Sequence, residues 1–481
     1  MWDTWLYYHE GVHYLYYLHE TSGACFDGMS VATSTDGVHY SEVGSIIEKR
    51  DDAEWLGTGS IWRAGDRFVL NFSEQRNGVQ AIFFAVSDDL IHWQRLGDEY
   101  RCDPDPRWYD NTPTGRWDCI WAIPRPGGGF CGYLTARPWS HTPGLTYESV
   151  GKVESEDGLH WRAAEPPQID WGEWPRMDLG EVGAIERIGE RYYLIVGAYA
   201  AGDLGNRHDV DVLGRLPGMY VYVGDSPEGP FQADTGAYRL LATNVIVAPM
   251  ATYFARFYPT PGGMLLNHHS ISRANVRWLP PLKRVVVDGA GHLRLGYWEG
   301  NDAAKGKPID LDLAHCLPVQ PKAPGAGWVT ARNRLEIGQP HGGGLVLLPH
   351  HFNLERGVIL EGQMTVHEPT GRWSGIGLYV EQDAARHVGT AILAETRGRS
   401  EIGVLRHGRS FTPDDAPPIG IAAGCATHFR LFVRQGLIEL YLNDRLVQCY
   451  SLPEPTSGRL GLVFESGRAV FESVRAWEMN L

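Results

Sequence analysis

One segment of the chain reads Met177-Asp-Leu-Gly-Glu181-Val-Gly-Ala-Ile-Glu-Arg-Ile-Gly-Glu-Arg-Tyr-Tyr-Leu-Ile-Val-Gly-Ala-Tyr199. A carboxylate, Glu181, is followed by an apolar run, a glycine-centred turn and a second run rich in Tyr, Leu, Ile and Val. This pattern predicts a β-hairpin with an acid at its open end. The same layout, an acidic or small polar residue before a strand, occurs near Asp3, Ser60 and Asp118. Recurrence along the chain indicates a repeat architecture.

Composition excludes several classes of function. The chain has 481 residues, of which 43% are hydrophobic and 21% charged, so it can bury a large core and form two or more domains. Its 58 acidic and 43 basic residues give a net charge of −15. This charge repels phosphate backbones and anionic membranes, so neither nucleic acid nor a membrane surface is expected as a partner.

Cysteine usage and hydropathy indicate a cytoplasmic protein. The seven cysteines are odd in number and include no Cys-x-x-Cys pair, which argues against a disulfide framework and against a zinc cluster. No signal peptide precedes Trp2, and no apolar run approaches the ~20 residues that span a bilayer. We therefore expect a reducing, cytoplasmic environment, with neither cofactor nor metal.

A second signature repeats between strands. Ala32-Thr-Ser-Thr-Asp-Gly-Val-His-Tyr40 is echoed by Ala85-Val-Ser-Asp-Asp-Leu-Ile-His-Trp93, by Val153-Glu-Ser-Glu-Asp-Gly-Leu-His-Trp161 and, in degraded form, by Gly224-Asp-Ser-Pro-Glu-Gly-Pro-Phe231. Serine and an acid favour a tight turn, and the closing aromatic side chain can pack on a neighbouring sheet. The serines are 53, 68 and 71 residues apart. This spacing fits the four-stranded blades of a β-propeller.

A fifth unit follows the four copies. It consists of the strand Met250–Tyr258, the turn Pro259–Gly263 and the strand Met264–His269. We therefore predict an all-β chain that begins with a five-bladed β-propeller over residues 1–300.

The rest of the chain predicts a second β domain. Residues 301–327 are rich in Pro, Gly, Ala and Lys and are expected to connect the domains on the surface. Residues 328–481 contain apolar or alternating runs of strand length, which predict a jelly-roll-like β-sandwich. These runs are Val358–Val366, Gly375–Val380, His428–Val433, Leu437–Leu442 and Arg459–Phe464.

Three carboxylates carry the functional prediction. The innermost strand of each propeller blade lines the central channel, so residues at equivalent strand starts converge. Asp3, Asp118 and Glu181 occupy this position in blades one, three and four. Gathered carboxylates repel one another and split into ionised and protonated members, as glycoside cleavage requires. A single acid in a turn beside a strand is mostly solvated or caps the turn, but the shared repeat position of these three favours a catalytic group.

Five segments of the chain resemble glycoside hydrolase family 32, the β-fructofuranosidases and invertases. Trp2–Tyr17 is similar to the family's opening motif, without its Asn-Asp-Pro-Asn-Gly. Arg116-Trp-Asp118 stands where Arg-Asp-Pro is expected, and Glu181-Val-Gly replaces Glu-Cys-Pro. The other two segments are Trp55-Leu-Gly-Thr-Gly-Ser60, similar to a Ser-Gly-Ser motif, and Trp278-Leu-Pro-Pro-Leu-Lys-Arg-Val-Val-Val-Asp-Gly289, similar to a Leu-Pro-Arg-Glu-Leu segment.

The resemblance implies a propeller joined to a sandwich and a retaining furanosidase acting on a β-fructofuranoside or a related glycoside. It makes Asp3 the nucleophile, Asp118 the transition-state stabiliser and Glu181 the general acid/base. On this reading Asp3 is ionised, Glu181 is protonated, and their carboxyl groups are ~5 Å apart. The partner is an oligosaccharide or a small glycoside, and the reaction is hydrolysis or transglycosylation.

Further side chains are candidates for binding the sugar. An aromatic face packs on the C–H surface of a sugar, and Trp5, Trp55, Trp117, Trp121 and Trp171 are candidates for such stacking. Since the chain has 17 tryptophans, packing between blades is the competing interpretation for each of them.

Four polar residues complete the predicted site. Ser60 belongs to the blade-two motif, and Arg116 can hold a carboxylate or a sugar hydroxyl, although a surface ion pair explains it equally well. His268 and His269 close the inner part of blade five, where they can contact substrate, lie near a channel cation or be structural.

Two other functions stay open. An arabinanase-like enzyme would invert configuration and use the first aspartate as a base. A non-catalytic carbohydrate-binding propeller would have lost its chemistry along with the intact motifs, although the three carboxylates argue against that reading.

Overall fold

The computed structural model describes the chain except for a set of short segments. These are residues 21–25, 140–148, 171–177, 200–217, 235, 237–238, 243–251, 272–275, 320–326, 368–373, 409 and 453–454. Within the described part, no helix is both long and apolar enough to cross a membrane.

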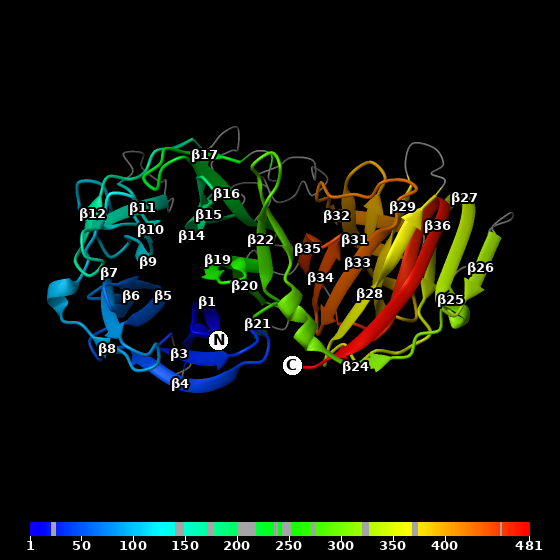
Figure 1. Ribbon diagram of the computed structural model, residues 1–481, viewed down its shortest axis with the longest axis horizontal. Coiled ribbons are helices and arrows are strands. Elements are labelled where there is room, and N and C mark those ends of the chain that lie inside the picture. Colours follow the sequence, from blue (N-terminus) through cyan, green and yellow to red (C-terminus); the bar gives the residue numbers. More distant parts are fainter. Residues whose placement is uncertain are drawn as a thin grey trace.

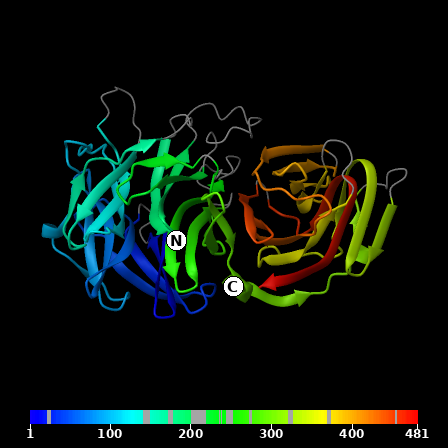
Figure 2. The same ribbon diagram turned by 45° about the horizontal axis from the view of Figure 1, so that its top comes forward.

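Four separate sheets and the first strands of a fifth, larger sheet form a ring, the predicted five-bladed propeller (Figures 1 and 2). The larger sheet continues through β24 into the C-terminal part of the chain. The first blade contains β1 (Trp2–His9), β2 (Val12–His19), β3 (Gly28–Ser34) and β4 (Ser41–Glu48), paired in that order. β1 also contacts the first two strands of the fifth blade, which closes the ring. The second blade contains β5 (Trp55–Ala64), β6 (Arg67–Arg76), β7 (Val79–Ser87) and β8 (Gln94–Arg95), and the third contains β9 (Trp117–Pro124), β10 (Phe130–Ala136), β11 (Ser149–Ser155) and β12 (Trp161–Ala164). The fourth blade contains β14 (Asp178–Ile188), β15 (Arg191–Tyr199), β16 (Gly218–Gly224) and β17 (Phe231–Ala233), with the short strands β13 (Ile169–Asp170) and β18 (Leu241–Ala242). The fifth blade contains β19 (Thr252–Thr260), β20 (Gly263–Ile271), β22 (Lys283–Val287) and β23 (Leu293–Tyr297), with the short strand β21 (Arg277–Trp278).

The repeated Ser-x-Asp signature forms the turn between the third and fourth strands of a blade. The Asp36 carboxylate accepts a hydrogen bond from the Ser34 hydroxyl at 2.9 Å and contacts His39 Nδ1 at 2.7 Å. Ser87 with Asp89, and Ser155 with Asp157, make the same contact. The repeat read from the sequence is therefore a turn that satisfies its own polar groups.

The second strand of a blade holds the inner strand of the next blade. The Asn71 side chain of β6 donates to the Ile120 carbonyl at 2.9 Å and accepts from the Ile120 amide at 2.8 Å. Thr135 of β10 accepts from the Val182 amide at 2.9 Å, and Asn267 of β20 donates to the Thr4 carbonyl at 3.0 Å. These buried polar side chains fix the positions of three channel-lining strands, β9, β14 and β1.

All five inner strands are irregular near their starts. The pairing register shifts between Trp2 and Trp5 in β1, between Leu56 and Gly59 in β5, and at corresponding places in β9, β14 and β19. Asp3, Cys119 and Phe254 have positive φ values of 43°, 56° and 59° at these bulges. A bulge redirects a side chain out of the alternating pattern. The irregularity thus turns strand-start side chains toward the channel.

The C-terminal part is a sandwich of two sheets that share one strand, β36 (Leu460–Met479). Its first part, Leu460–Glu465, pairs with β29, and its second part, Ala469–Glu478, pairs with β28. The change occurs at Ser466 and Gly467, whose φ values are 48° and 92°. The remaining strands are β26 (Gly327–Ala331), β27 (Arg334–Leu347), β28 (Val358–Val366), β29 (Gly375–Asp383), β30 (Val388–Glu395), β31 (Ser400–Arg406), β32 (Ser410–Asp415), β33 (Thr427–Arg434), β34 (Leu437–Leu442) and β35 (Arg445–Ser451).

The segment expected to be a connector contains short elements that lie against the sandwich. They are η2 (Glu299–Ala304), β24 (Lys305–Ile309), η3 (Leu313–His315) and β25 (Leu317–Pro318). β24 pairs with β36, and β25 pairs with β27.

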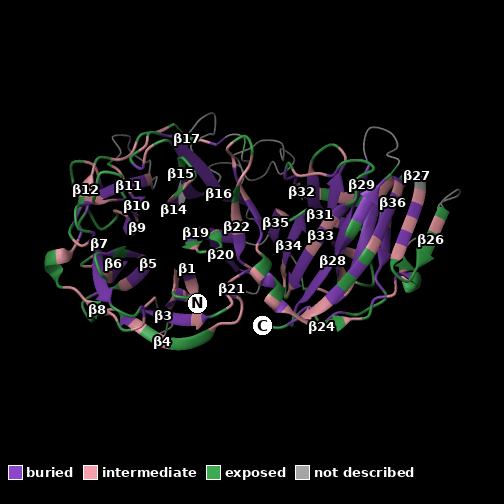
Figure 3. Cartoon of the chain, viewed as in Figure 1, coloured by how far each residue is buried: buried purple, intermediate pink, exposed green. Residues whose placement is uncertain are grey.

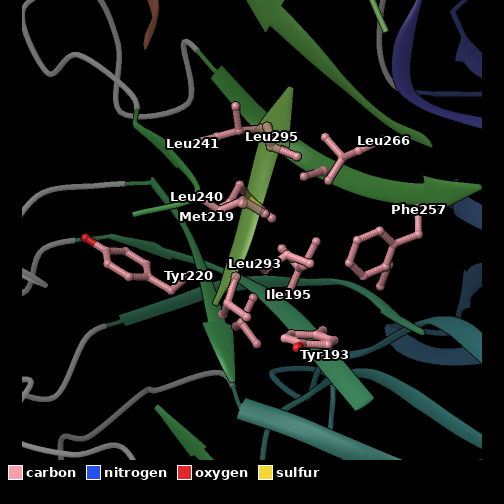
Figure 4. Close-up of a cluster of buried hydrophobic side chains, with 14 of the residues drawn as sticks. Tyr193, Ile195, Met219, Tyr220, Leu240, Leu241, Phe257, Leu266, Leu293 and Leu295 are labelled. Carbon is pink, nitrogen blue, oxygen red and sulfur yellow. The ribbon is translucent and has the colours of Figure 1, made fainter. Parts of the chain in front are cut away.

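One hydrophobic core runs from the propeller into the sandwich. Its propeller side contains Ile195, Met219, Leu266 and Leu293 (Figure 4), and Phe432 of the sandwich belongs to the same cluster. Figure 3 shows buried residues on both sides of this junction. The sandwich therefore buries one side of the propeller.

Candidate active site

The predicted catalytic carboxylates come together at the bulged inner strands. Arg116, just before β9, uses one nitrogen, Nη2, to contact Asp118 at 2.9 Å and Glu181 at 2.5 Å. Asp118 lies at the start of β9, and Glu181 lies beside the register shift of β14. A single cation thus bridges carboxylates from blades three and four.

Asp3 is the buried member of this group, with 6% of its surface exposed. Its Oδ1 has no hydrogen-bond partner among the described residues and lies 3.8 Å from His269 Nδ1. Burial raises the pKa of Asp3 well above its ordinary value, and the charges of Glu181 and Asp118 raise it further.

The pKa of Asp3 bears on the predicted role of this residue as an ionised nucleophile. Arg256 and Arg116 lower the pKa of Asp3, but they do not outweigh its burial. The raised pKa disfavours the ionised form, because the carboxyl group is almost fully desolvated.

Asp118 is held rigidly from the neighbouring blade. Ser73 on β6 donates to its Oδ1 at 2.5 Å, and Gln80 on β7 donates to the Ser73 hydroxyl at 3.2 Å. Gly57 leaves room for this arrangement, since a Cβ there would lie 2.2 Å from Ser73 Oγ and 3.1 Å from Asp118 Oδ1. The glycine of the predicted blade-two motif is therefore required by a close approach.

Arg256 of β19 is a channel residue that the sequence analysis missed. It is fully buried, and its guanidinium carbon lies 4.0 Å from the Phe254 ring centroid and 5.3 Å from that of Trp121. Nη2 contacts Cys119 Sγ at 3.0 Å, whereas Nε and Nη1 have no hydrogen-bond partner in the described part of the chain. In the sequence, Arg256 is the one charged residue in the aromatic segment Met250–Tyr258, and this pattern could have indicated a buried functional arginine.

The chain is similar to known proteins in its fold, although its sequence matches neither a family model nor a curated protein. Many solved structures match the chain, and three of them illustrate the likeness over most of their own length. They are the GH32 β-fructofuranosidase of Bombyx mori (14% identity, TM-score 0.64, 100% of this chain and 91% of the other), the sucrose-6-phosphate hydrolase of Lactobacillus gasseri (12%, 0.66, 98% and 88%) and the fructan 1-exohydrolase IIa of Cichorium intybus (12%, 0.65, 100% and 95%).

The chain has the fold of glycoside hydrolase family 32. The match covers both the propeller and the sandwich, so the resemblance read from the altered motifs is confirmed at the level of the fold.

Within this family 32 fold, two of the predicted stacking tryptophans are core residues. Trp5 and Trp117 are each 1% exposed, with ring centroids 5.6 Å from Tyr16 and 4.7 Å from Tyr109. Because both rings lie in the interior, neither offers a face to a sugar.

The other three tryptophans differ in position. Trp121 is 8% exposed and lies beneath Arg256 in the channel. Trp55 is half-buried, and its ring lies close to Gly57. A Cβ at Gly57 would lie 2.5 Å from the Trp55 ring and 3.1 Å from Asp118 Oδ1, so the ring and the carboxylate approach the same glycine. Trp171 lies outside the described residues. Trp55 is therefore the predicted tryptophan whose position best suits contact with substrate.

Ser60 ties two blades together instead of facing the channel. Its hydroxyl donates to the Ile120 carbonyl at 2.5 Å and accepts from Asn71 at 2.9 Å. These partners lie in β9 and β6, so the predicted substrate contact is replaced by a structural one.

The two adjacent histidines point to opposite sides of β20, as neighbours on a strand do. His269 faces Asp3, and burial lowers its pKa to about 3, so its ring is neutral. His268 faces the sandwich, where its Nε2 lies 3.8 Å from Cys449 Sγ and 3.9 Å from Glu439. Only His269 belongs to the candidate site.

His268, Glu439 and Cys449 form a group that could hold a metal ion. The Lys283 ammonium already lies 2.5 Å from Glu439 Oε1, and Tyr441 donates to the other carboxylate oxygen at 2.9 Å. A cationic side chain therefore takes the place that a metal ion would need.

Proposed function

We propose that this protein is a glycoside hydrolase that cleaves fructofuranosides, with Asp3, Asp118 and Glu181 as its catalytic groups. The observation that carries the proposal is the single Arg116 nitrogen between Asp118 and Glu181, next to a buried Asp3 with a raised pKa. The names of the structures that share its fold support the substrate class, since they include β-fructofuranosidases and a sucrose-6-phosphate hydrolase.

The proposed reaction has two displacements. An ionised Asp3 oxygen attacks the anomeric carbon while the glycosidic C–O bond breaks, and Glu181 donates a proton to the leaving oxygen. Glu181 then takes a proton from water, whose oxygen attacks the same carbon and releases Asp3. Asp118 stabilises the positive charge that develops on the sugar.

This mechanism requires an ionised Asp3 at the first step. Burial and the charges of Glu181 and Asp118 raise the pKa of Asp3 and disfavour that form, while Arg256 and Arg116 lower the pKa of Asp3. The two arginines therefore favour the form of Asp3 that attacks.

The activity is tested with sucrose, sucrose 6-phosphate, short fructans and aryl α-L-arabinofuranosides. Cleavage of a fructoside is expected, and Glu181→Gln should lower kcat about 10²–10⁴-fold. Glu190→Gln, at the exposed turn between β14 and β15, is the control and should leave kcat unchanged.

Two results would contradict parts of the proposal. If the folded protein cleaves none of the fructosides but binds a sugar, the non-catalytic alternative holds. If NMR shows that the first-formed anomer is inverted, the arabinanase-like mechanism replaces the double displacement.

We also propose that the protein works in a reducing compartment such as the cytoplasm. Six described cysteines are free thiols, and four of them are buried. Disulfides persist mainly in oxidising compartments, and this pattern is typical of chains kept reduced.

A further inference from the structure

A cavity lies at the junction between the propeller and the sandwich. It is bounded by residues of the β3–β4 turn, by the segment after β21 and by β33, β34 and β35 of the sandwich. Figure 1 labels β21, β34 and β35 near the junction of the propeller and the sandwich. The space in which the centre of a water molecule can lie has a volume of about 90 Å³. One water needs roughly 10–15 Å³ on this measure, so the cavity holds on the order of six to nine such groups.

The walls of this junction cavity are mostly apolar. Apolar walls with a few polar groups are typical of sites for small organic molecules. The lining includes Val38, Leu279, Pro280, Phe432, Ile438 and Met479.

Three polar atoms of the lining residues have no hydrogen-bond partner among the residues that the structure describes. They are Tyr40 Oη, Trp278 Nε1 and Arg434 Nε, each with almost no exposed surface. A buried polar group without a partner costs about 1–3 kcal/mol. Since all three atoms can donate a hydrogen bond, they favour a ligand that accepts one.

The two charged side chains that line the cavity, Glu439 and Arg434, differ in how they are paired. Glu439 lines the cavity, but Lys283 neutralises it at 2.5 Å. Burial is the only cause that shifts the pKa of Arg434, with no charged partner among the described residues, and its guanidinium carbon lies 5.2 Å from the Trp278 ring centroid. Burial lowers the pKa of Arg434, which shows that its charge is poorly solvated. An anionic group beside it would be stabilised.

We propose that the junction cavity binds a small molecule with an apolar body and a carboxylate, its carboxylate directed at Arg434 and Trp278. A ring with one carboxylate has the size that the volume allows. This inference is independent of the proposed hydrolase activity, because none of its residues belongs to the candidate active site.

The test uses benzoate as the probe, titrated into the full-length protein by calorimetry and followed by quenching of tryptophan fluorescence. Saturable binding is expected, and benzyl alcohol and acetate should each bind at least about 10-fold more weakly, because one lacks the charge and the other the apolar body.

Arg434→Met keeps the length of the side chain but removes its charge, and it should weaken benzoate binding at least 10-fold. The matched control is Arg406→Met, on the exposed surface of β31, which should bind benzoate as the wild type does. Melting temperatures verify that both variants fold, and if Arg434→Met does not, Trp278→Phe tests the same contact.

Three outcomes would overturn the proposal. They are no saturable benzoate binding, equal binding by folded Arg434→Met or Trp278→Phe protein, or equal binding of benzyl alcohol. Loss of benzoate binding in the Glu181→Gln variant with retention in Arg434→Met would place the probe in the active site instead.

Discussion

At the residue scale, the charges around Asp3 decide how the site titrates. Two carboxylates and burial raise its pKa, and two arginines oppose them. Arg116 is exposed enough to meet substrate, whereas Arg256 is fully buried. The two cations therefore have different tasks: Arg116 contacts Asp118 and Glu181 directly, and Arg256 supplies a buried positive charge near Asp3.

Arg256→Met should raise the pKa of Asp3 further, because the substitution removes a cation that lowers it. If an ionised Asp3 is the nucleophile, the acidic limb of the kcat/KM profile should move to higher pH by about one unit, equivalent to ~1.4 kcal/mol. Arg63→Met, exposed on β5, serves as the control. An unchanged acidic limb in folded Arg256→Met protein would show that Arg256 is only a packing residue.

Asp3→Asn should stabilise the protein at neutral pH. Since the folded-state pKa lies above the unfolded value of about 3.9, ionisation of Asp3 destabilises the fold as pH rises between these values. The melting midpoint should be higher than that of the wild type at pH 7, by on the order of 1–2 °C, and the gain should shrink toward pH 4. The control Asp66→Asn, at an exposed turn, should leave the melting midpoint unchanged both at pH 7 and near pH 4. A pH-independent difference would remove Asp3 ionisation as the cause.

At the element scale, local patterns predicted strands and turns well but predicted contacts between blades poorly. The Ser-x-Asp turns were visible because both partners lie within three residues. The roles of Ser60 and Trp117 could not be predicted from local patterns, because their hydrogen-bond partners Ile120 and Cys102 lie in other strands or loops. The bulges at Asp3 and Cys119 leave no signature in composition, so the direction of channel side chains had to come from the structure.

The corner in β36 makes a second element-scale prediction. Gly467 has a φ of 92° where the strand passes from one sheet to the other, a conformation that a Cβ strains. Gly467→Ala should lower the free energy of unfolding by about 1–2 kcal/mol. Gly327→Ala, in β26 with open space at its Cβ and no positive φ, is the control and should be near neutral. Equal stability of both variants by urea denaturation would mean that the corner can relax.

At the scale of the whole molecule, the sequence predicted two β domains, with boundaries at 1–300, 301–327 and 328–481. That division remains a proposal, and the shared core argues that its parts depend on each other. Tyr297 of blade five packs on Phe432 and Tyr441 of the sandwich, with ring centroids 6.0 Å and 5.4 Å away.

A fragment of residues 1–300 should therefore aggregate or melt at a lower temperature than the full chain, since it exposes this apolar face to water. We expect stronger binding of a hydrophobic dye and loss of fructoside cleavage. Restoring residues 301–481 in the same chain is the control. A soluble, fully active 1–300 fragment would show that the sandwich does not support the propeller.

The shared strand β36 also bears on the order of events during synthesis. It pairs with β24, β27, β28 and β29, and it follows all of them in the chain. At ~5–20 residues per second, a ribosome finishes β28 on the order of ten seconds before it finishes β36. For that interval the strand edges that β36 will cover are open to wrong partners. A nascent chain paused before Leu460 should therefore recruit chaperones, and one that has released β36 should not.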